Sequence, residues 1–143
     1  MIERVTDLEK AASDIAFIEK HCFATPWSVQ QVKSSGDTTV FFTANDDGKI
    51  VGYAGMYTVL DEGYVTNIGV LPDHRKKGIG KALTNQLIDY SVSQKLAFLS
   101  LEVRVSNTPA INLYTSLGFK EVGKRKNFYS NPKEDALIMT RYF

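Results

Sequence analysis

A carboxylate inside an apolar segment is the first candidate for chemistry in this sequence. Glu102 interrupts the apolar run from Leu99 to Val105, and a carboxylate in such a run is costly unless it is exposed, paired or functional. If the run is a strand, alternation places Glu102 on the face opposite Leu101 and Val103. Two interpretations stay open: Glu102 is a general base, or it forms a buried ion pair with Arg104 on the same face.

An amide and a phenol follow at helical spacing. Asn107 and Tyr114 lie seven residues apart, which is two helical turns, so one ligand can contact both side chains. A tyrosine hydroxyl has an ordinary pKa of about 10 and can serve as a general acid. For Tyr114 taken alone, core packing beside Leu113 and Leu117 is the competing interpretation.

A strand, a basic loop and the start of a helix follow one another between Ile68 and Leu83. Gly78 and Gly80 let backbone N–H groups approach a ligand closely, and a helix N-terminus adds roughly half a positive charge. With the basic run Arg75-Lys76-Lys77, the segment predicts a local phosphate or pyrophosphate site. The spacing matches neither the nucleotide-triphosphate loop nor the dinucleotide loop, so those cofactors are disfavoured. A basic turn that caps an amphipathic helix is the alternative.

The glycine spacing resembles that of a known family. Arg75-x-x-Gly78-x-Gly80 is similar to the Arg/Gln-x-x-Gly-x-Gly/Ala signature of GNAT acetyltransferases, whose loop amides hold the pyrophosphate of acetyl-CoA. Further segments resemble the branch that acetylates protein N-terminal amines, in particular the ribosomal-protein-alanine acetyltransferases of the RimI family. They are Phe23-x-x-Pro26-Trp27-Ser28, Leu101-Glu102-Val103-Arg104-x-Ser106-Asn107, Ala110-x-x-Leu113-Tyr114, Leu117-Gly118-Phe119 and Pro132-x-Glu134-Asp135-Ala136-x-x-Met139.

The resemblance implies an enzyme that transfers acetyl from acetyl-CoA directly to an amine. It assigns Glu102 as the general base, acting through a water, and Tyr114 as the acid that protonates the departing sulfur. The Val70 amide would support the thioester oxygen as negative charge develops. The implied contacts to acetyl-CoA are Ile68, Gly69, Val70, Arg75, Lys76, Lys77, Gly78, Ile79, Gly80, Lys81, Asn107 and Tyr114.

The implied acceptor is a protein N-terminal α-amine, most specifically the N-terminal alanine of a ribosomal protein. Its groove would lie between the Ala24 to Ser28 loop and a hairpin, lined by Trp27, Asn127, Phe128 and Tyr129. A terminal amine has a pKa of about 7.7 to 8.0 and a lysine about 10.4, so one modest base suits the terminal amine better. Two alternatives stay open: a small-molecule amine as acceptor, or a module that binds acetyl-CoA without catalysis.

The elements that must position these residues form an α/β pattern. Apolar spacing, caps and turn residues predict three antiparallel strands in succession, then alternating strands and helices. Together with the resemblance, this predicts a GNAT fold with a mixed sheet of about seven strands and four helices, in one domain over residues 1–143. The predicted strands are 2–5, 39–44, 50–60, 64–70, 98–103, 120–126 and 135–142. The predicted helices run from Asp7 to Thr25, from Trp27 to Val32, from Gly78 to Lys95, and from Thr108 to Leu117.

The composition sets outer limits on partners and location. Seventeen basic and sixteen acidic residues give a net charge of +1, so we expect no direct nucleic-acid partner. The absence of a leader or a long apolar run predicts a cytoplasmic protein without a membrane segment, as a monomer or weak dimer. The single cysteine, Cys22, is interpreted as a small core residue. Two histidines without paired ligand spacing predict no metal site.

Overall fold

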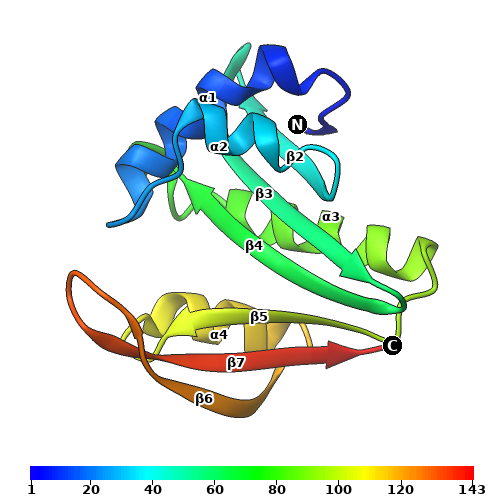
Figure 1. Ribbon diagram of the computed structural model, residues 1–143, viewed down its shortest axis with the longest axis vertical. Helices are drawn as coiled ribbons and strands as arrows, with labels where there is room; N and C mark the ends of the chain where they lie inside the picture. The colour runs from blue at the N-terminus through cyan, green and yellow to red at the C-terminus, as the bar shows by residue number, and fades with distance from the viewer.

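The computed structural model describes residues 1–143 and contains one sheet of seven strands in the order β1-β2-β3-β4-β5-β7-β6. Figure 1 shows the sheet with helices on both faces. The strands are β1 Ile2–Arg4, β2 Thr39–Asp46, β3 Lys49–Val59, β4 Glu62–Val70, β5 Phe98–Arg104, β6 Lys120–Tyr129 and β7 Glu134–Tyr142. The helices are α1 Leu8–Cys22, α2 Val29–Ser34, α3 Ile79–Ser93 and α4 Thr108–Ser116, with a short 3-10 turn at Pro72–His74. The predicted mixed sheet and its four helices are confirmed.

Local sequence signals explain where the elements begin and turn. Asp7 caps α1 by accepting a hydrogen bond from the Lys10 amide, and Ser28 caps α2 in a complete capping box with Gln31. The hairpin between β2 and β3 turns through Asp47 and Gly48, with φ of 54° and 79°. Both residues are therefore left-handed, as the tightest hairpin turn requires.

The two faces of the sheet are covered by different helices. Along β3, the Tyr53 hydroxyl donates to Glu19 of α1, whereas a Cβ added at the neighbouring Gly52 would meet Leu83 of α3 at 3.2 Å. Successive strand residues point to opposite faces, so α1 and α3 lie on opposite sides of the sheet. In Figure 1, α3 and α4 lie behind the sheet, and no helix crosses in front of β5 and β7.

Several predicted boundaries were wrong by a few residues. Helix α1 ends at Cys22, and Phe23, predicted as helical, has extended backbone as the C-cap. Gly78, predicted as the first residue of its helix, is instead the left-handed N-cap of α3, with a φ of 82°. Strands β6 and β7 meet through Tyr129 and Glu134, so the last hairpin is longer than predicted. No helix is both long and apolar enough to cross a membrane.

Candidate active site

A split between two neighbouring strands creates the site. β4 and β5 run parallel, and their paired residues are Glu62 to Tyr64 with Phe98 to Ser100. Beyond that point the strands diverge, as Figure 1 shows. The remainder of β4 pairs with β3 along one edge only. Backbone groups on the other edge of β4 are therefore available to a ligand as far as the Val70 N–H, since unpaired N–H and C=O groups require partners; the Val70 carbonyl already accepts from Arg75 Nε.

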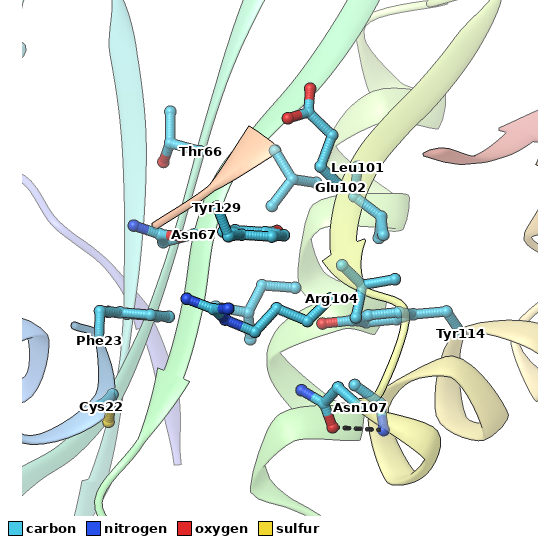
Figure 2. Close-up of a pocket in the computed structure, with 14 residues that line it drawn as sticks. Cys22, Phe23, Thr66, Asn67, Leu101, Glu102, Arg104, Asn107, Tyr114 and Tyr129 are labelled. Atoms are coloured by element: carbon cyan, nitrogen blue, oxygen red, sulfur yellow. Dashed lines mark hydrogen bonds between the residues drawn. The ribbon is translucent and has the colours of Figure 1, made fainter. Parts of the chain in front are cut away.

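A pocket occupies this split. Its lining comes from the end of α1, β4, β5, α4 and the tip of β6, so that segments distant in sequence converge on it (Figure 2). The lining residues are Cys22, Phe23, Val65, Thr66, Asn67, Ile68, Leu101, Glu102, Val103, Arg104, Asn107, Ala110, Tyr114 and Tyr129. The structure thus brings together five residues predicted to contact a ligand: Ile68, Glu102, Asn107, Tyr114 and Tyr129.

Glu102 lies on the uncovered face of β5. Glu102 is exposed, whereas Leu101 and Val103 on either side of it are buried, so the predicted alternation is confirmed. The alternative of a buried ion pair with Arg104 is wrong, because Glu102 is accessible and its cationic neighbour is Arg125, with Nε 3.6 Å from Oε1. Glu102 lines both the main pocket and a second hollow bordered by Tyr57 and Tyr64. A carboxylate here can exchange protons with solvent and with a ligand in the split.

Tyr114 reaches the pocket from α4. Its ring packs edge-on against Phe119, with centroids 5.8 Å apart, and its hydroxyl points into the pocket (Figure 2). Burial raises the pKa of Tyr114 to about 12, and the neighbouring Tyr129 adds to the shift. The hydroxyl therefore keeps its proton at neutral pH and can donate it. The ring thus packs as the core interpretation expects, while the hydroxyl is left at the pocket, and the acid role stays a prediction.

Arg104 fixes the β6–β7 hairpin over the pocket. Its guanidinium contacts Glu134 at 3.2 Å, donates to the Pro132 carbonyl at 2.8 Å and covers the Tyr129 ring at 4.4 Å from the centroid. Glu134 also accepts a hydrogen bond from the Ser106 amide at 2.7 Å. Burial, followed by the charge of Glu102, raises the pKa of Tyr129 to about 12. The hairpin is thus held against β5 by charge-assisted contacts.

The basic loop has the backbone of an anion site. Lys76 and Gly78 have positive φ of 64° and 82°, and α3 begins immediately afterwards at Ile79. Alternating backbone conformations of this kind turn successive N–H groups toward one point, at the positive end of a helix. A Cβ at Gly78 would meet nothing within 4 Å, so the approach is open. Arg75 donates from Nε to the Val70 carbonyl at 2.9 Å, which ties the loop to the end of β4.

The other predicted contacts have different positions. The Asn107 side chain lines the pocket but also caps α4, because its Oδ1 accepts from the Ala110 amide at 3.3 Å. Trp27 packs against the core, the backbone N–H of Asn127 donates to Asp135 Oδ1 at 2.8 Å, and Phe128 is 48% exposed. Of the four predicted acceptor residues, only Tyr129 is part of the pocket lining.

Cys22 lies where α1 meets the pocket. It packs partly against the core and lines the pocket, and burial raises the pKa of its thiol. The chain has no group of three or more His, Cys, Asp or Glu side chains arranged to hold a metal ion.

Sequence reasoning missed two residues beside the pocket. Glu19 is completely buried, and Asn67 donates to it from β4. A signal for Glu19 was present, because it lies four residues after Ile15, on the buried stripe of α1. The position of Asn67 depends on a strand irregularity that no local pattern marks.

The fold and this site define an acetyltransferase. The model of the acetyltransferase (GNAT) family matches residues 4–119, so the chain belongs to that family. It is an acetyl-CoA-dependent N-acetyltransferase by that membership and by its similarity to such enzymes. The split between β4 and β5 and the open loop before α3 fit a long co-substrate with phosphates at one end.

Similar proteins include enzymes that act on a ribosomal protein. The ribosomal protein bS18-alanine N-acetyltransferase of Escherichia coli strain K12 is 40% identical over 139 residues, 94% of each chain. A putative enzyme of the same name from Bacillus subtilis strain 168 is 36% identical, over 85% of this chain and 83% of that one. The crystal structure of the Escherichia coli ribosomal-protein-S18-alanine N-acetyltransferase superposes with a TM-score of 0.89 at 37% identity, covering 99% of this chain and 94% of that chain.

Proposed function

We propose that this enzyme acetylates the N-terminal α-amine of a protein, specifically the N-terminal alanine of a ribosomal protein. The observation that carries the proposal is the convergence of Glu102 and Tyr114 on one pocket in the split between β4 and β5. Its relatives, named as enzymes acting on a ribosomal protein alanine, support this acceptor. The full chain, residues 1–143, would serve as one catalytic domain.

Glu102 would take the proton from the acceptor amine. Its carboxylate extends away from the Tyr114 hydroxyl, which lies across the pocket in Figure 2. A water between Glu102 and the amine would relay the proton, because Glu102 also borders the second, solvent-facing hollow. The Arg125 guanidinium lies beside this carboxylate, with Nε 3.6 Å from Oε1, and is its nearest cationic partner.

Tyr114 would return a proton to the leaving group. Acetyl-CoA supplies the acetyl group as a thioester, so a carbon–nitrogen bond forms while the carbon–sulfur bond breaks. The Tyr114 hydroxyl faces the pocket and is protonated at neutral pH because burial raises its pKa to about 12. It would donate that proton to the departing sulfur, and the Val70 amide would stabilise charge on the carbonyl oxygen.

The remaining predicted contacts would bind the rest of acetyl-CoA. Loop and helix amides from residues 76 to 81 would hold the pyrophosphate at the N-terminus of α3. Backbone groups of Ile68, Gly69 and Val70 would pair with the pantetheine arm, as an additional strand pairs with a sheet edge. Asn107, with its Oδ1 occupied by the helix cap, would contact the ligand through its amide nitrogen.

Steady-state kinetics with a peptide series tests this assignment. The series contains four peptides that differ only in their first residue, which is Ala, Ser, Leu or Glu. They are compared with the alanine peptide blocked at its N-terminus and with two small amines, spermidine and glucosamine. We expect the highest kcat/KM for the alanine peptide and no transfer to the blocked one. A small amine that outperforms every free N-terminus would refute the proposal.

A further inference from the structure

A buried carboxylate lies immediately behind the pocket. Glu19 has no exposed surface and accepts three hydrogen bonds: from the Trp27 amide at 2.9 Å, the Tyr53 hydroxyl at 2.5 Å and Asn67 Nδ2 at 3.1 Å. Its partners come from the loop before α2, from β3 and from β4. A buried carboxylate is costly unless donors surround it. Here three donors and no cation do so, and no step described above uses the group.

A bulge in β4 makes the contact with Asn67 possible. Gly55 of β3 pairs with Asn67 and the next residue, Met56, pairs with Val65, so Thr66 is an extra residue in β4. Paired residues project to the same face of a sheet. Asn67 therefore shares the α1 face with Tyr53, although strict alternation from Tyr64 would turn it toward α3. A Cβ at Gly55 would lie 2.5 Å from Thr66 Oγ1, so glycine leaves the space that the bulge occupies.

The carboxylate determines which end of the Asn67 amide faces the pocket. Glu19 Oε2 accepts from both the Tyr53 hydroxyl and Asn67 Nδ2, so the nitrogen end of the Asn67 amide is directed toward Glu19. Its Oδ1 is left for the pocket, which Asn67 lines together with Glu102 and Tyr114. In Figure 2 the Asn67 amide nitrogen points away from the pocket. The site therefore contains a hydrogen-bond acceptor of fixed direction beside the proposed base.

We propose that Asn67 Oδ1 binds the α-amine of the acceptor, and that Glu19 is the positioning residue that sets the direction of this amide. The inference rests on the proposed function, because the ligand is the amine of the acetylated terminus. An amine or ammonium offers only N–H donors to this oxygen. Through its bond to the Trp27 amide, Glu19 also ties the α1–α2 loop to the same strand. One carboxylate thus aligns the two sides of the acceptor site.

Two substitutions and one matched control test the inference. In Glu19→Gln the new amide nitrogen faces Asn67, so the Asn67 amide turns over and presents Nδ2 to the amine. Asn67→Leu removes the polar contact at similar volume. We expect each variant to lower kcat/KM for the peptide by about 10- to 100-fold, mainly through KM, with acetyl-CoA affinity unchanged by calorimetry. Their effects should be non-additive in the double variant, because both act on one contact.

Tyr53→Phe is the control, because it removes another donor to Glu19 but leaves Asn67 in place. We expect it to lower thermal stability while the KM for the peptide stays within twofold of wild type. Two results would overturn the inference by showing that the network is only structural support. One is an equal effect of Tyr53→Phe and Glu19→Gln on the KM for the peptide. The other is a loss of acetyl-CoA affinity in both Glu19→Gln and Asn67→Leu. If the wild-type enzyme prefers another amine, the proposed function fails, and the same KM comparison with that amine still decides the role of Asn67.

Discussion

Replacing Tyr114 by Phe removes one oxygen and isolates the role of the acid. The aromatic ring and its contact with Phe119 are retained, and Figure 2 draws no hydrogen bond from the hydroxyl to the other pocket residues. The free energy of unfolding should therefore change by less than about 0.5 kcal/mol. Loss of a general acid lowers the rate by about 10²- to 10⁴-fold, or roughly 3 to 5 kcal/mol in activation free energy.

The assay follows thiol release from acetyl-CoA and peptide mass in parallel. Tyr114→Phe should lower kcat by that factor and leave the KM for acetyl-CoA within threefold of wild type. Tyr90→Phe is the matched control, because its ring packs against Phe42 away from the pocket, and its kcat should be unchanged. A Tyr114→Phe enzyme with a kcat within threefold of wild type would refute the acid role.

Four further results follow from the geometry. Glu102→Gln should lower kcat at least about 100-fold, while Glu121→Gln, an exposed carboxylate on β6, should not; initial rates decide. With rising pH, kcat/KM should increase through the pKa of the acceptor amine, about 8. It should then stay level to about pH 10, because burial raises the pKa of Tyr114 to about 12 and the acid keeps its proton. A decrease in kcat/KM that begins below pH 10 would exclude this tyrosine as the titrating acid. Gly78→Ala should cost about 1 kcal/mol in urea denaturation because its φ is positive, whereas Gly80→Ala, inside α3, should be neutral or stabilising. Hydrogen bonds from Ser106 hold the pKa of Glu134 below its usual 4.5. The contribution of Glu134 to stability is therefore present above pH 4.5 and is lost as the pH falls through the lower pKa of the folded state. The difference in the free energy of unfolding between wild type and Glu134→Gln should shrink from about pH 7 to about pH 3, and a constant difference would contradict this.

Elements with local determinants were predictable from the sequence. The Asp47-Gly48 hairpin and the Ser28 cap each depend on residues within one turn of the chain. The helix predicted from Thr108 also begins there, although its cap is Asn107 and not Thr108. Glu102 was predictable too, because a lone carboxylate in an apolar strand is visible in the order of residues. Its true partner was not, since Arg125 comes from β6, two strands away in the sheet.

Features set by long-range pairing could not be predicted. The bulge at Thr66 reverses the direction of every later side chain in β4, and it depends on a glycine in β3. The position of Asn67 therefore contradicts simple alternation. Likewise, the contacts of Arg104 with the β6–β7 hairpin span about 30 residues. Trp27 and Phe128, expected from resemblance to line the groove, are not among the residues that line the pocket, whereas Phe23, which was not expected there, is.

The most direct measurement uses one peptide that carries both a free N-terminal alanine and an internal lysine. After incubation with the enzyme and acetyl-CoA, fragmentation by tandem mass spectrometry locates the acetyl group. We predict a single acetyl group on the alanine α-amine, absent with Glu102→Gln. An acetyl group on the lysine, with the terminus still free, would contradict the central claim that this site acts on protein N-termini.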